Sequence, residues 1–251
     1  MPTPFMHLQI AEKIHAVREV PSSVRQRILQ QLPAFYLGHV APDYQTITSI
    51  PRYQTHFYNL PPGPEEDACS EMLAQYPELA QAGALSEDHS VFIAAYCCHL
   101  MLDLRWYREI LVPFFLGPGD WEDHRHRFIV HNTLLTYLDL KAFASLGSSV
   151  DRTLAEAQPS DWLPFATNED LTSWRDFLTP QMRSGATPFT VEIYAGRLNM
   201  TVEEFSSNLA SETWMEENVF SRVDLDVVLS LLSTAVGDSI DLINEYYQAA
   251  V

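Results

Sequence analysis

The residues of this chain best suited to chemistry are histidines and aspartates spaced like metal ligands. His99 and Asp103 stand four residues apart in an apolar stretch that reads as helix, so their side chains share one face. An imidazole and a carboxylate on one face can bind the same cation, and a carboxylate among apolar residues is costly unless it is paired or bound to metal. Taken alone, this spacing also arises by chance. It then favours the simpler alternative of a His–Asp hydrogen bond between helices, with Arg105 as a further partner.

Two further groups shift the balance towards a metal site. Asp43 follows Pro42 in a turn shaped by glycine and proline, and His56 lies in the segment Thr55-His56-Phe57. Each has an ordinary alternative, a turn cap for Asp43 and a loop position for His56. All nine histidines fall within the first 131 residues, however, which favours a site in the N-terminal half. Two Asp and two His can fill a tetrahedral or five-coordinate site and leave one position for water.

Four fragments follow one another along the chain: His7, the segment Phe35-Tyr36-Leu37-Gly38-His39-Val40-Ala41-Pro42-Asp43, then Thr55-His56-Phe57, and His99 with Asp103. In their order and rough spacing, over residues 5–110, they resemble the zinc-dependent phospholipase C and single-strand nuclease superfamily, whose members are all-α. The resemblance implies that one zinc is bound by Asp43, His56, His99 and Asp103. It also implies that His7 binds another zinc, with Asp103 bridging the two ions.

The chain departs from that family where further ligands are expected. Secreted members use the free amino group of an N-terminal Trp, whereas this sequence starts with Met1-Pro2-Thr3. Six residues after the helix Asp the family has a His, followed later by His-x3-Glu; here that position is Glu109 and no such motif follows. The candidates for a second metal position are therefore Glu109, His131 and Asp139, of which the last two stand eight residues apart and share a helix face. His124 belongs to a charged helix start and is expected to be solvated.

Substrate contacts are assigned to Tyr58, Arg105 and Trp106. Tyr58 lies next to a ligand segment and can form part of an aromatic rim, while Arg105 can hold a phosphate or a carboxylate. Trp106 follows the His–Asp pair and can line a pocket. The plainer alternatives are core packing for Trp106 and salt bridges to the abundant acidic residues for Arg105.

This ligand set predicts a metal-dependent phosphoester hydrolase similar to zinc-dependent phospholipase C. The cation, zinc or else iron or manganese, lowers the pKa of a bound water toward about 7, and the resulting hydroxide attacks a phosphodiester with Asp43 as a general base. The expected substrate is a small phosphodiester or a phospholipid head group. The alternative is a non-catalytic helical protein with a structural metal site, or a binding module; coordination that leaves no position open for water would favour it.

Composition limits the other classes of function. Asp and Glu number 33 against 15 Lys and Arg, a net charge of −18, which disfavours nucleic acid as a partner. With 9 glycines and no glycine-rich phosphate loop, P-loop and dinucleotide-binding enzymes are excluded. The cysteines Cys69, Cys97 and Cys98 are an odd number with two adjacent, so no disulfide framework is expected. No signal peptide or transmembrane segment is expected either, which predicts a reduced, cytoplasmic protein and leaves its oligomeric state open.

The elements that must position these residues are predicted to be helices. Apolar residues recur at helical spacing, strand signals are few and 47% of the residues are hydrophobic, which predicts one all-α multi-helix domain over residues 1–251. Residues 91–111, apolar nearly all round, should form a long buried central helix, and residues 35–64, rich in proline, a long loop. Other helices are predicted over 5–20, 22–32, 121–146, 188–198, 202–217 and 225–249, with short helices between 155 and 188. Residues 1–146 form the metal-binding half and 147–251 a helical scaffold, with 150–190 as a lid or subdomain.

Overall fold

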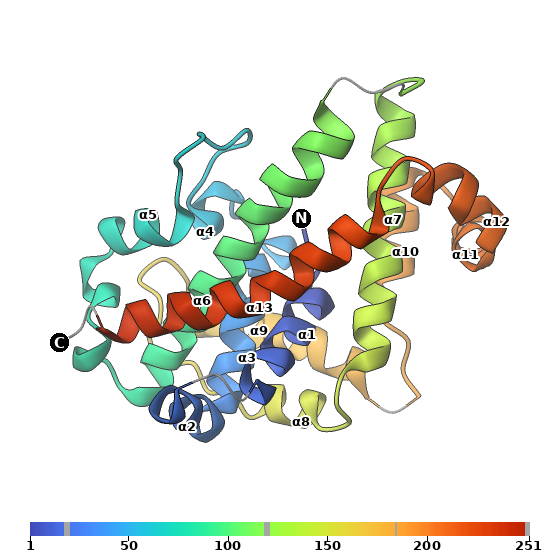
Figure 1. The fold of residues 1–251 in the computed structure, drawn as a ribbon. Helices are drawn as coiled ribbons and strands as arrows, with labels where there is room; N and C mark the ends of the chain where they lie inside the picture. Colours follow the sequence, from blue (N-terminus) through green and yellow to red (C-terminus); the bar gives the residue numbers. More distant parts are fainter. Residues whose placement is uncertain (18–20, 118–120, 184, 249–251) are drawn as a thin grey trace.

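Every regular element is a helix in the computed structural model, which describes residues 1–17, 21–117, 121–183 and 185–248 (Figure 1). No strand occurs within these ranges, which confirms the predicted all-α class and the single helical domain. Among the described residues, no helix combines the length and the apolar character needed to cross a bilayer. The helices pack around one long central helix, which carries two of the candidate ligands.

The central helix is α6 (Glu87–Trp106), which continues without a break into the π-helical segment η4 (Tyr107–Leu116). It confirms the predicted buried helix over residues 91–111 and continues through Pro113 to Leu116. Most of the side chains of α6 are buried on every face, as its apolar sequence predicts. Pro113 lies inside η4, and because proline has no N–H to donate, the wider π-helical turns accommodate it. The segment closes at Gly117, whose N–H donates to the carbonyl oxygen of Val112 at 2.7 Å.

Four helices pack against α6 or against its neighbours: α1 (Pro4–Ala16), α3 (Leu32–Val40), α7 (His124–Ser145) and α13 (Leu225–Gln248). Figure 1 shows α13 crossing α6, with α7 and α10 (Thr190–Leu198) to one side. The closest approach is between α3 and α6, at Gly38. A Cβ atom on Gly38 would lie 2.4 Å from the carbonyl oxygen of Phe92 and 2.7 Å from Cβ of Ala95, so only glycine fits there.

The predicted long loop over residues 35–64 is wrong, because most of this stretch is helical. It contains most of α3, then η1 (Ala41–Ile47) and α4 (Tyr53–His56). Pro42, one of the prolines that suggested a loop, lies in the first turn of η1, where a missing N–H costs nothing. From Ala34 to Val40 every residue of α3 is buried, so the sequence shows no amphipathic period that would reveal the helix.

The other predicted helices keep close to their predicted positions, except that residues 202–217 are not one continuous helix, and helices within residues 68–84 and over 150–155 were not predicted. The first helix ends at Ala16 rather than at residue 20, which lies outside the described residues. The other helices of the N-terminal half are α2 (Ser22–Gln30), α5 (Ala68–Gln75), η2 (Pro77–Ala80) and η3 (Ala82–Ala84). The C-terminal half adds α8 (Val150–Ala155), α9 (Asn168–Leu178), η5 (Thr179–Met182), α11 (Val202–Ala210), α12 (Glu212–Met215) and η6 (Glu216–Phe220). Residues 150–190 pack on α3 and η1, where the Trp174 indole donates to the carbonyl oxygen of Val40 at 2.7 Å.

A disulfide joins α5 to α6, which corrects the expectation that all cysteines are reduced. Cys69 pairs with Cys97 across a Cα–Cα distance of 5.0 Å, and Cys98 is free and buried. Neighbouring residues on a helix point about 100° apart. Cys97 can therefore face α5 while Cys98 faces α13, where its thiol lies 3.8 Å from the carbonyl oxygen of Ser239. Disulfides persist in oxidising surroundings, so this pair weighs against the expected cytoplasmic location, which stays a prediction.

Candidate metal centre

Five side chains from four elements meet beside the middle of α6. They are His7 from α1, Asp43 from η1, His56 from the last position of α4, and His99 with Asp103 from α6. Two groups share His99, one with His7 and Asp103 and one with Asp43 and His56; within each, one donor atom per residue lies within 4.8 Å of the others. The structure therefore brings together all five residues assigned to the metal from the sequence.

The carboxylate of Asp103 lies at the middle of this cluster. Its Oδ1 is 3.5 Å from Nε2 of His7, and its Oδ2 is 3.5 Å from Nε2 of His56 and 3.9 Å from Nε2 of His99. Nε2 of His56 also lies 3.6 Å from Oδ1 of Asp43. Two ligands at right-angled or tetrahedral positions around a zinc ion are about 3–3.4 Å apart, given bonds of about 2.0–2.1 Å. The observed separations are slightly wider, which leaves room for a cation of this size.

Hydrogen bonds to Nδ1 fix the orientation of two of the imidazole rings. Nδ1 of His99 lies 2.8 Å from the carbonyl oxygen of His39, and a carbonyl can only accept, so Nδ1 carries the proton. Nδ1 of His56 lies 2.8 Å from Oγ1 of Thr55, whose own proton goes to the carbonyl oxygen of Arg52 at 3.1 Å. This nitrogen too must therefore donate. In both rings Nε2 is left with its lone pair towards the cluster, which is the state a metal ligand requires.

Several polar atoms of the cluster are buried and have no hydrogen-bond partner among the described residues. They are both ring nitrogens of His7, Nε2 of His56 and His99, and Oδ1 of Asp103. Buried polar groups are nearly always satisfied, and leaving several unsatisfied within one site is costly. A cation within either group of donors would satisfy the members of that group, so each group fits a metal ion.

Burial sets the charges of these groups. It lowers the pKa of His99 to about 3, with the neighbouring His7 adding to the effect, and it lowers the pKa of His56 despite the contact with Asp43. Burial alone would raise the pKa of Asp43 and of Asp103. The contact of Asp43 with His56 outweighs this effect of burial, so the pKa of Asp43 is lowered. The contacts of Asp103 with His7 and Arg52 likewise lower the pKa of Asp103. Neutral imidazoles beside ionised carboxylates are the forms that bind a divalent cation.

Arg52 is a functional residue that sequence reasoning missed. Its Nη2 donates to Oδ2 of Asp103 and, at 2.7 Å, to the hydroxyl of Tyr58, which itself donates to the same carboxylate oxygen at 3.3 Å. Arg52 stands four residues before His56, immediately before α4, and this helical spacing was the available signal. Its guanidinium neutralises Asp103 from the side opposite Oδ1. Tyr58, assigned to substrate from the sequence, therefore lies at the edge of the centre.

His39 is a second residue without an assigned role that lies against the cluster. Its ring is buried, and neither ring nitrogen has a hydrogen-bond partner among the described residues. Burial, with His7 and His99 close by, holds the pKa of His39 well below its usual value. The rings of His7 and His99 are stacked, with centroids 3.7 Å apart and planes inclined by 8°. This stack places their Nε2 atoms on the same side, towards Asp103.

The other site residues expected from the sequence lie elsewhere. Glu109 forms a salt bridge with Arg105 at 2.7 Å, His131 accepts a hydrogen bond from the Trp106 indole at 3.3 Å, and Asp139 accepts from the hydroxyls of Thr3 and Thr190. The candidate second-site residues Glu109, His131 and Asp139 thus do not meet, and neither metal-binding group of the described residues contains them. Trp106 is fully buried in the core, and Arg105 also pairs with Asp238 on the partly exposed face of α6, away from the cluster.

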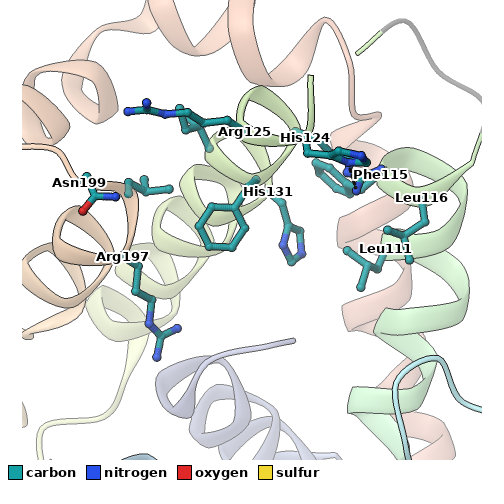
Figure 2. Close-up of a pocket in the computed structure, with 12 residues that line it drawn as sticks. Leu111, Phe115, Leu116, His124, Arg125, His131, Arg197 and Asn199 are labelled. Atoms are coloured by element: carbon teal, nitrogen blue, oxygen red, sulfur yellow. Dashed lines mark hydrogen bonds between the residues drawn. The ribbon is translucent and has the colours of Figure 1, made fainter. Parts of the chain in front are cut away.

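A cavity of about 690 Å³ opens beside the centre and is lined by residues of both halves of the chain, Asp43 and Arg52 among them. A neighbouring pocket of about 610 Å³ shares three lining residues with it, Phe128, His131 and Arg197 (Figure 2). The side chain of Asp43 is 16% exposed, whereas those of His7, His56, His99 and Asp103 are at most 1% exposed. Asp43 is therefore the ligand candidate that a molecule in the cavity can reach.

Comparison of the chain with protein-family models, with curated proteins and with solved structures finds no match. The assignment of these residues as possible metal ligands therefore rests on the sequence and structure of this chain alone.

Proposed function

We propose that this chain is a metal-dependent phosphoester hydrolase, similar to zinc-dependent phospholipase C. Metal is held in the two groups of donors that share His99, one completed by His7 and Asp103 and the other by Asp43 and His56. One observation carries the proposal: three unpartnered imidazole nitrogens and two ionised carboxylates converge at the edge of a cavity large enough for a small molecule. His with carboxylate suits zinc, and also iron or manganese.

A divalent cation bound here supplies Lewis acidity, which polarises a phosphoryl oxygen and acidifies water. Side chains of the protein accept the proton and position the carboxylates. Asp43 is ionised and faces the cavity, so it can accept the proton of a water that attacks phosphorus. The 3.6 Å contact from His56 orients the Asp43 carboxylate, and Tyr58 and Arg52 hold Asp103 in place. As the new P–O bond forms, the P–O bond to the alcohol breaks, and the leaving oxygen takes up the proton that Asp43 accepted, directly or through water.

The substrate in this proposal is a small phosphodiester or a phospholipid head group. With a net charge of −18, the chain repels a long polyanion such as nucleic acid. The second candidate function is a non-catalytic protein with a structural metal site or a binding module. The near-complete burial of four of the five ligand candidates favours it, because structural sites are closed to water.

Elemental analysis together with hydrolysis of a small phosphodiester separates the two functions. We expect purified protein to contain at least one equivalent of metal and to cleave 4-nitrophenyl phosphocholine in a chelator-sensitive reaction. His99→Ala should lower the bound metal well below one equivalent, whereas the exposed His124→Ala, the matched control, should leave it unchanged. Activity that persists in excess chelator would exclude the metal mechanism. Full metal content without cleavage of any phosphodiester in a panel would favour the structural site.

A further inference from the structure

The 690 Å³ cavity combines a charged end with an apolar wall. Asp43 and Arg52 lie at the end next to the metal centre, and Arg197 from α10 lines the same cavity. Much of the rest is lined by large apolar side chains from α1, α7, α9 and α10: Phe5, Phe128, Leu135, Trp174, Phe177 and Ile193. Ligand sites typically show this combination of an apolar surface and a few polar groups that fix orientation.

Arg52 keeps donors free for a ligand. Both of its hydrogen bonds, to Asp103 and to Tyr58, use Nη2, so Nη1 and Nε have no partner among the described residues. The Arg52 side chain is 25% exposed, and it borders the cavity. A planar guanidinium with one edge fixed and another edge unoccupied is well suited to hold a phosphate or carboxylate group.

Arg197 makes no salt bridge to a carboxylate of the described residues. Its guanidinium carbon lies 4.9 Å from the centre of the Tyr194 ring. Arg125 and Arg152 likewise have no salt bridge among the described residues, and Arg197 differs from both in that it lines the cavity. Figure 2 shows Arg197 and His131 extending to the same side of the neighbouring pocket, whereas Arg125 extends away from them.

Arg52 and Arg197 both line this cavity. Of the carboxylates that line the cavity, Asp43 belongs to the metal centre. Asp139 is already hydrogen-bonded by Thr3 and Thr190. Neither neutralises Arg197.

We propose that this cavity binds an amphiphilic anion, with its phosphate or carboxylate group between Arg52 and Arg197 and its apolar chain along the wall of aromatic and aliphatic side chains. That such a molecule is also the substrate rests on the proposed function. That the cavity binds it does not. As a substrate, it would be a phosphodiester with an apolar chain and an anionic, rather than cationic, head.

Binding of short-chain amphiphiles in the presence of chelator tests this directly, because metal then contributes nothing. Hexyl phosphate, hexyl phosphocholine and hexyl glucoside share one apolar chain and carry an anionic, a zwitterionic and a neutral head. We expect the full-length protein to bind hexyl phosphate about tenfold more tightly than either of the others, measured by titration calorimetry. Equal affinity for the three would overturn the proposal.

Variants locate the site. Arg197→Gln should weaken hexyl phosphate binding about tenfold and leave hexyl glucoside unaffected, while Arg197→Lys should keep much of the preference. Arg152→Gln, on α8 and outside both pockets, is the matched control and should behave as wild type. If Arg197→Gln folds normally and binds hexyl phosphate unchanged, the anion is not held here. Loss of this binding would not exclude metal-dependent hydrolysis. Conversely, a protein that hydrolyses no phosphodiester could still bind hexyl phosphate at this site.

Discussion

Arg52 occupies a place where its side chain and a bound cation would compete for one carboxylate, that of Asp103. Its guanidinium donates to Oδ2 of Asp103 while Oδ1 has no partner among the described residues. Without metal, this pair keeps a buried negative charge compensated. With metal, two positive charges share Asp103.

Removing Arg52 should therefore destabilise the metal-free protein more than the metal-loaded one. Breaking a largely buried ion pair from one side costs about 3 kcal/mol, and a cation on Asp103 would offset much of that cost. We expect Arg52→Gln to lower the melting temperature in chelator and to show a larger rise on zinc addition than wild type does. Thermal unfolding with and without zinc measures both. An equal rise in both proteins would contradict competition for Asp103.

Asp139 gives the protein a predictable pH dependence. Burial raises its pKa from 3.8 to about 6, although Thr190 and Thr3 donate hydrogen bonds to it. A group with a raised pKa in the folded state adds stability below pH 4, and this contribution is lost as the pH rises through 6. Asp139→Asn should thus be more stable than wild type at pH 7, by about 3 kcal/mol, and similar to it at pH 4. Denaturant unfolding at the two pH values checks this, and a variant that is less stable at pH 7 would show that the ionised carboxylate is favoured.

Among the elements, α3 decides how well the site is assembled. It packs against α6 at Gly38 and leads directly into η1, which carries Asp43, while the carbonyl oxygen of His39 orients His99. A displacement of α3 along α6 would therefore move Asp43 and break the hydrogen bond that orients His99.

Gly38→Ala should disturb both the fold and the metal centre. The added methyl group would lie 2.4 Å from a backbone oxygen that cannot move aside, and overpacking of this kind costs about 1–3 kcal/mol. We expect a lower melting temperature and reduced metal content. Gly196→Ala is the matched control, since nothing lies within 4 Å of its Cβ position on α10; it should be neutral or stabilising by up to about 1 kcal/mol. Similar losses in both variants would point to a general effect of the substitution.

At the scale of the molecule, one core joins the two halves of the chain. Buried hydrophobic residues form a single cluster that runs from Phe5 to Tyr246. The ligand candidates lie in the first half, but the cavity beside them needs α9 and α10 from the second. The halves are thus parts of one structure.

We therefore expect one calorimetric unfolding transition, shifted as a whole to lower temperature by chelator. A cation bound only by the folded chain stabilises every part that unfolds together with it. Two transitions, of which one is insensitive to chelator, would show that the halves unfold separately.

The sequence allowed prediction of the parts of this structure that depend on local spacing. His99 and Asp103 share a face because helical geometry dictates it, and the apolar run around them predicted the central helix. Partners set by the tertiary fold could not be predicted: the pairing of Arg52 with Asp103 spans 51 residues, and that of Cys69 with Cys97 depends on how α5 lies on α6. The helix α3 was missed because a segment that is buried on nearly all sides has no polar face.

The order of the ligand candidates along the chain has a consequence for biosynthesis. His7, Asp43, His56, His99 and Asp103 all precede α9 and α10, so the donor set is synthesised before the helices that line the cavity. An ion can be captured by the growing chain while α9 and α10 are still to be synthesised. Metal loading on the ribosome would then precede the closing of the cavity, and the last helices would fold onto a centre that is already filled.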